Sequence, residues 1–302
     1  MNSLLHTLHA PWVLGCALLL SACGGGDQPA DGADAPAQEV SIDDANNAIG
    51  QGLLKLDREI FSLPSPVQTA ILLQKNAVKY NEGLVNPVNA ESSYLNRTQK
   101  ALNMGVYGAD LAYLSNFNNT QMKNDYLRVV EKIATDMDIR NHIDQSLIDR
   151  FALNIDNRDS IYSLNAELFN SVDRYLKESG ESHIAALILT GGWVEGMHIT
   201  LGSAVSNAEI RNRVGEQASA ARSLRKLIMR MEDPALKELE TMLADLDESF
   251  QSLGFNYTYV KPITDASERV TYLNSKSSVT MSDEQLKEIT ERVNAIREYI
   301  IR

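Results

Sequence analysis

Two long segments of the chain are apolar on nearly every side of the helix that each would form. They cover residues 101–114 and 184–201, and neither contains Lys or Arg. A surface helix carries one apolar stripe, whereas a helix that is apolar all round has protein neighbours on every side. We therefore expect both helices at the centre of a larger helical domain.

The second segment also approaches the length of a membrane span, because its 18 residues are predominantly apolar. It contains three glycines and two threonines, together with Glu195 and His198. Ionisable side chains are costly inside a bilayer, so we favour a central helix of a soluble domain.

Helix signals recur along most of the remaining chain. Caps and first-turn prolines stand at Ser65-Pro66 and Asp233-Pro234, and a capping box covers residues 282–285. Apolar residues follow these signals at helical spacing. The predicted helices cover about residues 41–61, 65–82, 90–117, 120–135, 144–155, 159–177, 181–205, 208–231, 234–253 and a last stretch from 282.

One stretch near the C-terminus departs from this pattern. Residues 255–279 alternate in Tyr257-Thr258-Tyr259-Val260 and again at 270–273, which predicts a short hairpin or an extended loop. The predicted fold class is all-α, a multi-helix bundle of about ten helices. It forms either one bundle or two packed sub-bundles, with one short extended or hairpin segment near the C-terminus.

The N-terminal end resembles a bacterial lipoprotein precursor. Residues 11–20 are apolar but too short to span a bilayer, and the lipobox-like Leu20-Ser21-Ala22-Cys23 follows, although no Lys or Arg precedes the run. The resemblance implies that residues 1–22 are a signal peptide. It also implies that Cys23 becomes the mature N-terminus and carries covalent diacylglycerol and palmitate.

A low-complexity tether is predicted behind that cysteine. Residues 23–39 are rich in Gly, Ala and Asp, which is typical of a flexible linker, and residues 40–302 would form the helical domain. The residue after Cys23 is glycine rather than aspartate, and the lipoprotein resemblance then implies an outer-membrane anchor facing the periplasm. Cys16 leaves with the signal peptide, so we expect no disulfide and no thiol chemistry in the mature chain.

The net charge restricts the partners. The formal charge of -12 falls entirely on the part after residue 22 and argues against nucleic acid. An envelope protein or a small ligand remains open, besides the membrane that the lipid anchor would contact.

Each of the two apolar segments carries one acid, which suggests a site. Asp110 and Glu195 are costly to bury unless they are paired, hydrogen-bonded or protonated. We hypothesise that they face each other, with Tyr107 and His198 one helical turn away and Trp193 nearby. Such a set could bind the polar end of a small ligand or a metal ion, and we weigh it against a structural pair satisfied by backbone groups, Asn103 or Thr190. We favour the structural pair.

A short phrase within the second segment resembles imelysin-like proteins. The sequence from Gly196 to Leu201 matches part of the Gly-x-His-x-x-Glu motif of that helical family, with Leu201 where the family has glutamate. The resemblance implies a metal site that uses Glu195 and His198. Motifs of common hydrolases, phosphate-binding loops and zinc proteases do not occur in the sequence, so we expect no catalysis.

Several phrases together resemble a family of bacterial lipoproteins that brings no activity, cofactor or partner with it. They lie between about residues 63 and 201, and the most specific is Gly105-Val106-Tyr107-Gly108-Ala109-Asp110-Leu111. The sequence therefore favours a membrane-anchored, periplasm-facing lipoprotein with a non-catalytic ligand-binding, protein-binding or scaffolding role. The alternative is a metal-binding, imelysin-like protein.

Overall fold

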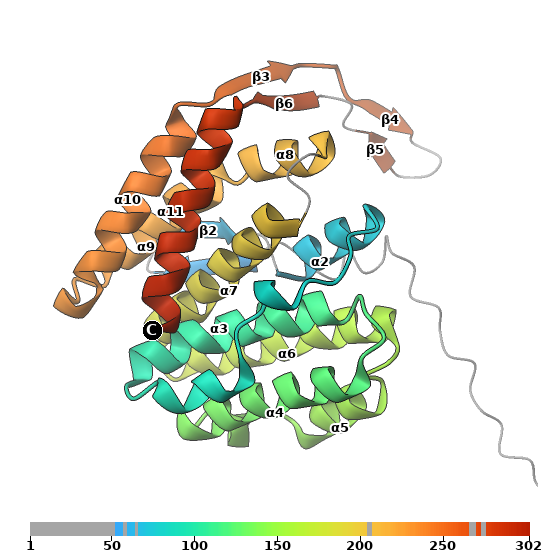
Figure 1. Cartoon of the computed structure of the whole chain (residues 1–302), viewed down its shortest axis with the longest axis vertical. Helices are drawn as coiled ribbons and strands as arrows, with labels where there is room; N and C mark the ends of the chain where they lie inside the picture. The colour runs from blue at the N-terminus through green and yellow to red at the C-terminus, as the bar shows by residue number, and fades with distance from the viewer. Residues whose placement is uncertain (1–51, 57–58, 64–65, 204–206, 266–269, 273–275) are drawn as a thin grey trace, which may run out of the picture. The chain divides into compact units, whose positions relative to one another are not determined.

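A computed structural model describes residues 52–56, 59–63, 66–203, 207–265, 270–272 and 276–302 (Figure 1). All of them belong to the compact unit Val40–Arg302. The predicted signal peptide, the lipidated Cys23 and the linker up to residue 39 lie outside the described residues, so those predictions stay predictions.

Two central helices, α3 (Arg97–Leu114) and α7 (Ser182–Ser203), form the middle of the bundle, as the sequence predicted. Their backbones touch at two glycines. A Cβ added to Gly105 would lie 2.0 Å from the carbonyl oxygen of Ile188, and one added to Gly191 would lie 1.8 Å from that of Leu102. Only glycine permits so close an approach at these positions.

α7 is the one helix among the described residues that is long and apolar enough to cross a membrane by length and composition. Within the fold, 94% of its apolar window is buried by protein. This burial agrees with the prediction of a central helix, because a helix surrounded by protein needs no lipid to cover its apolar sides.

The other helices pack around this pair, and the all-α, multi-helix class is confirmed. α11 lies against α7 and α10, and α6 and α4 lie beside α3 (Figure 1). Capping boxes at Asn96 and Ser282 start α3 and α11. The surrounding helices are α2 (Pro66–Lys75), α4 (Thr120–Asp136), α5 (Gln145–Leu153), α6 (Arg158–Glu178), α8 (Ala208–Gly215), α9 (Ala218–Arg230), α10 (Lys237–Gln251) and α11 (Asp283–Ile301). Short 3₁₀ turns are η1 (Glu82–Leu84), η2 (Val88–Ser93), η3 (Arg140–His142) and η4 (Pro234–Leu236).

The first predicted helix is wrong over the residues that the structure describes. Instead of a helix to about residue 61, β1 (Gly52–Leu56) and β2 (Glu59–Leu63) form an antiparallel pair, with Leu54 opposite Phe61. The local sequence does not predict these strands, because Leu53, Leu56, Ile60 and Leu63 follow one another at helical spacing, and the pairing of the two segments decides for strands. The rest of that predicted helix, residues 41–51, lies outside the described residues.

Three other helix boundaries also differ from the prediction. α2 ends at Lys75 because the chain turns at Ala77, whose φ is +49°. α3 begins at Arg97 rather than near residue 90, since Asn96 caps it and η2 precedes it. The predicted helix 208–231 is split at Glu216 and Gln217 into α8 and α9.

The predicted C-terminal hairpin is present and has two parts. β3 (Gly254–Thr258) pairs antiparallel with β6 (Lys276–Thr280), and β4 (Ile263–Asp265) pairs antiparallel with β5 (Val270–Tyr272). The described residues between 254 and 280 are called the arm below. The arm joins α10 to α11 and extends past α8 (Figure 1).

Candidate functional site

The structure brings the two predicted acids together. Asp110 on α3 and Glu195 on α7 are both completely buried, and they lie close enough together for the Glu195 carboxyl group to raise the pKa of Asp110. Asp110 follows Gly105 by five residues and Glu195 follows Gly191 by four, so both acids lie just beyond the glycines at which the two helices touch.

Arg297 on α11 provides a positive charge next to the two acids. The Arg297 guanidinium donates from Nε to Glu195 Oε2 at 2.7 Å and from Nη2 to Glu195 Oε1 at 2.9 Å. The arginine side chain is only 11% exposed. This two-point geometry is the strongest form of an Arg–carboxylate pair, and it engages both oxygens of Glu195.

The surroundings of Asp110 favour its neutral form. Burial raises its pKa well above the ordinary value, and the neighbouring Glu195 raises the pKa further. Asp110 Oδ2 accepts a hydrogen bond from the backbone N–H of Asn86 at 3.1 Å, whereas Oδ1 has no hydrogen-bond partner among the described residues.

Three tyrosines form hydrogen bonds with the segment Asn86–Pro87, which connects η1 to η2 and contacts Asp110. Tyr126 Oη donates to Asn86 O at 2.7 Å, Tyr107 Oη donates to Pro87 O at 2.8 Å, and Asn86 Nδ2 donates to Tyr94 Oη at 2.8 Å. The pKa of Tyr107 and that of Tyr126 are raised, chiefly by burial. Neutral phenols at these positions hold the Asn86–Pro87 segment in place. The segment therefore stays where the Asn86 backbone N–H can donate its hydrogen bond to Asp110.

His198 lies one turn beyond Glu195, as predicted, but it bonds elsewhere. Its Nδ1 donates to Asn294 Oδ1 at 2.8 Å, because an amide oxygen only accepts. Its Nε2 is buried and has no hydrogen-bond partner among the described residues. Burial lowers the pKa of His198, and the Arg297 charge lowers it further.

The remaining predicted residues do not converge on the acid pair. Trp193 is buried, and its Nε1 donates to Gln217 Oε1 at 3.2 Å. We expected backbone groups, Asn103 or Thr190 to satisfy the acids. A backbone group does so for Asp110, through the Asn86 N–H, whereas Asn103 and Thr190 bond elsewhere. Asn103 Nδ2 donates to backbone carbonyls of Gln99 and Ile300, and Thr190 Oγ1 donates to Ala186 O.

The geometry of the site does not favour metal binding. Among the residues that the structure describes, no group of three or more His, Cys, Asp or Glu side chains is placed to hold a metal ion. Glu195 already has both oxygens on Arg297, so a cation at Glu195 and His198 would have to displace a guanidinium.

Sequence reasoning missed Arg297 and Asn86. A signal for Arg297 was available, since it follows Val293 by four residues and precedes Ile300 by three, within the buried stripe of α11. A charge inside such a stripe indicates a buried partner. Asn86 carried no comparable signal, because it contributes a backbone N–H from an irregular segment.

The fold and the site define an all-α bundle closed around a buried cluster of two acids and an arginine. Comparison with known proteins adds no relative: no protein-family model, no curated protein and no solved structure matches the chain. The resemblances to bacterial lipoproteins and to imelysin-like proteins therefore stay predictions.

Proposed function

We propose that this chain is a lipid-anchored, non-catalytic lipoprotein of the outer membrane that binds a partner protein on the periplasmic side through its arm. The lipobox-like sequence supports the anchor, and the surface of the arm supports the partner. The observation that carries the proposal is the concentration of exposed aromatic and aliphatic side chains on the arm.

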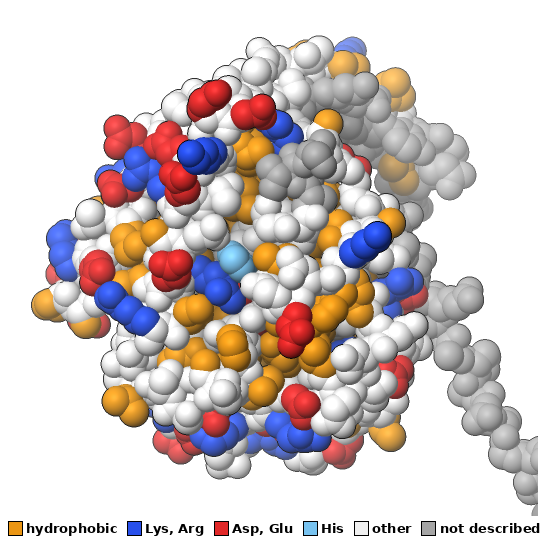
Figure 2. Space-filling model, viewed as in Figure 1, with side chains coloured by type: hydrophobic (Ala, Val, Ile, Leu, Met, Phe, Trp, Pro, Cys, Tyr) orange, Lys and Arg blue, Asp and Glu red, His pale blue; other side chains and the backbone are white. Residues whose placement is uncertain are grey.

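These side chains are unusually open to solvent. Phe255 is 55% exposed, Tyr257 68%, Tyr259 67% and Ile263 60%. Phe255 and Tyr257 are two residues apart in β3, so they project to the same side of that strand, and Tyr259 follows directly after its end. Figure 2 shows hydrophobic side chains at the surface in the upper right, where Figure 1 places the arm.

The backbone of the arm also favours a protein partner. Each of its two described sheets has only two strands, and two-stranded hairpins are marginally stable in water without further packing. In β6 the N–H of Val279 already donates to Asn212 Oδ1 on α8 at 3.0 Å. The edge strands of such small sheets otherwise present N–H and C=O groups that another strand can pair with. Exposed tyrosines are enriched in protein interfaces because they combine apolar area with a polar end.

The acid pair supports the non-catalytic part of the proposal. A general acid or base must reach a substrate proton, yet Asp110 and Glu195 are fully buried, with Asp110 bonded to Asn86 and Glu195 bonded to Arg297. A structural role accounts for every one of these contacts.

Site-specific photo-crosslinking tests the proposal. A photoreactive phenylalanine replaces Tyr257 in the full-length protein in its native envelope, and the matched control places it at Leu153 on α5, which is 84% exposed. We expect one discrete protein adduct from position 257, abolished by Phe255→Ser with Tyr259→Ser, and none from position 153. A second copy of the chain in the adduct would identify the partner as self. Adducts with lipid alone at position 257, or equal adducts at both positions, would overturn the proposal.

The metal-binding alternative rests on one observation, the buried His198 Nε2 without a hydrogen-bond partner among the described residues. Elemental analysis of protein purified without chelator tests it. A near-stoichiometric metal that is lost with both His198→Ala and Glu195→Gln would favour the alternative. Metal that persists in either variant, or protein that never contains metal, would reject it.

A further inference from the structure

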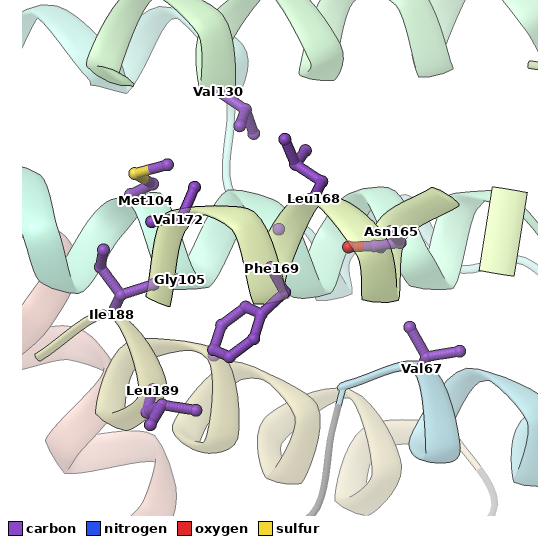
Figure 3. Close-up of a pocket in the computed structure, with 12 residues that line it drawn as sticks. Val67, Met104, Gly105, Val130, Asn165, Leu168, Phe169, Val172, Ile188 and Leu189 are labelled. Atoms are coloured by element: carbon purple, nitrogen blue, oxygen red, sulfur yellow. The ribbon is translucent and has the colours of Figure 1, made fainter. Parts of the chain in front are cut away.

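An apolar slot lies between α6 and the central helices, apart from the acid pair and from the arm (Figure 3). Its volume is about 60 Å³. The lining comes from α2, α3, α4, α6 and α7, and none of the lining residues is charged. Leu168 and Phe169 of α6 are only partly buried, so the slot reaches the surface beside that helix.

One polar side chain lines the slot, and it has an unused donor. Asn165 on α6 is drawn among the apolar side chains in Figure 3, and its Nδ2 is buried without a hydrogen-bond partner among the described residues. Buried amide groups are nearly always hydrogen-bonded, so an exception calls for an explanation. A ligand with an acceptor atom would supply the missing bond.

A glycine in the wall supports the same interpretation. Gly108 lies within α3, where glycine is a poorer helix former than alanine. At Gly105 the helix contact with α7 requires glycine, but a Cβ added to Gly108 would meet no atom within 4 Å. Packing therefore does not explain Gly108, and its missing side chain leaves space in the slot.

We propose that this slot binds a small, uncharged, mainly apolar molecule with one hydrogen-bond acceptor, of the class of short aliphatic ketones and esters. The acceptor oxygen takes the hydrogen bond from Asn165 Nδ2, and the carbonyl end of the ligand lies along the wall at Gly108. Since about 60 Å³ encloses only that end, the rest of the aliphatic chain extends through the opening beside Leu168 and Phe169. Charged ligands are excluded because the lining offers no compensating charge. This site is independent of the partner protein proposed for the arm.

Binding of 2-heptanone tests the slot, with heptanoate as the charged control of equal chain length. The protein is residues 24–302, which contain every residue that the structure describes, so that no lipid or detergent competes. NMR spectra report the side-chain NH₂ signal of Asn165 during each titration. We expect saturable binding of 2-heptanone that shifts this signal, and binding of heptanoate at least about tenfold weaker.

Two variants separate the slot from nonspecific binding. Asn165→Leu should weaken 2-heptanone binding about tenfold, the effect of one lost hydrogen bond. Gly108→Leu should abolish binding by filling the slot. If that variant does not fold, Gly108→Ala adds one methyl group in open space, and we expect it to raise Tm and to weaken binding at least threefold. Lack of saturable binding, equal binding of heptanoate, or unchanged affinity in folded variants at both positions would overturn the proposal.

Discussion

The acid pair and the apolar slot both border α3 and α7, yet they differ in how their polar groups are satisfied. In the acid pair, Glu195 has two bonds from Arg297 and Asp110 Oδ2 accepts from the Asn86 N–H, although Asp110 Oδ1 has no hydrogen-bond partner among the described residues. In the slot, the Asn165 Nδ2 donor also has no partner among the described residues. The acid pair is enclosed by the fold and compensated by a cation, whereas the Asn165 amide lies in a slot that reaches the surface, which makes the amide the better candidate for a ligand.

The difference follows from the cost of burial. Ionised groups inside a protein must find partners within the fold, because an unpaired buried charge costs several kcal/mol. A neutral amide in a slot that reaches the surface costs less, so the fold tolerates it without a partner until a ligand binds. Four predictions test this contrast, taken from the largest expected effect to the smallest.

Removing the cation should have the largest effect. Arg297→Met keeps much of the apolar stem but leaves Glu195 buried without its partner. We expect a loss of roughly 3–5 kcal/mol in the free energy of unfolding, measured by urea denaturation. Arg302→Met is the control, because that arginine is 62% exposed in its pair with Glu238 and should change stability by less than about 1 kcal/mol. Equal losses in both variants would show that Glu195 does not depend on Arg297.

The two glycines of α3 should respond in opposite directions. Gly105→Ala forces a methyl group against the Ile188 carbonyl, and backbone cannot yield as a side chain does, so we expect a loss of about 1–3 kcal/mol. Gly108→Ala should raise stability by up to about 1 kcal/mol, since the methyl group enters open space. Thermal denaturation of both variants measures these changes. A Gly105→Ala protein as stable as the wild type would contradict the close contact between the helices.

Asp110 should make the protein less stable as pH rises. Its pKa is raised in the fold, so above the ordinary value of 3.8 the unfolded chain releases a proton that the folded chain keeps. Stability then declines from about pH 4 upward, by at most about 1.4 kcal/mol per pH unit, until the raised pKa is reached. Asp110→Asn keeps a neutral side chain of the same shape that does not titrate, and it should flatten this slope. Urea denaturation at several pH values measures the slope, and an unchanged slope would show that Asp110 does not cause it.

His198 should contribute a smaller slope of the opposite sign. Its pKa is lowered in the fold, so below the ordinary value of 6.5 the unfolded chain binds a proton that the folded chain does not. Stability therefore falls as pH decreases from about 6.5 toward the lowered pKa. His198→Gln removes this contribution, and the NMR titration of the His198 ring in the wild type gives the pKa directly. A pKa at or above 6.5 would contradict the burial argument.

The sequence predicted the parts of this fold that depend on helical periodicity. The two all-round apolar segments became α3 and α7, and the lone acids within them met, because a buried acid on each of two packed helices has few other places to find a partner. The sequence did not predict that Arg297 pairs with Glu195, because a pair 102 positions apart leaves no local pattern. Only its place in the apolar stripe of α11 gave a signal.

The sequence did not predict the slot or the first hairpin, and the reasons differ from those for Arg297. A cavity is a property of how five helices pack, and no sequence period encodes the space beside Gly108 or the unused amide of Asn165. At β1 and β2 the cap-like residues near position 43 predicted a helix, and the apolar residues of 53–63 do not alternate in a way that would have predicted strands. Cap signals are short, and pairing across the chain decided the outcome over the described part.

The contacts of α11 also impose an order on folding. Glu195 receives its cation from a residue 102 positions later, and Asn103 bonds to Ile300, 197 positions later. Contacts of such separation form late, because the loop between them must close first. During synthesis, α3 and α7 emerge well before α11, so the carboxylate of Glu195 resists burial until the last helix arrives. A chain truncated before α11 would carry an unfinished core, open to proteolysis and recognisable as incomplete.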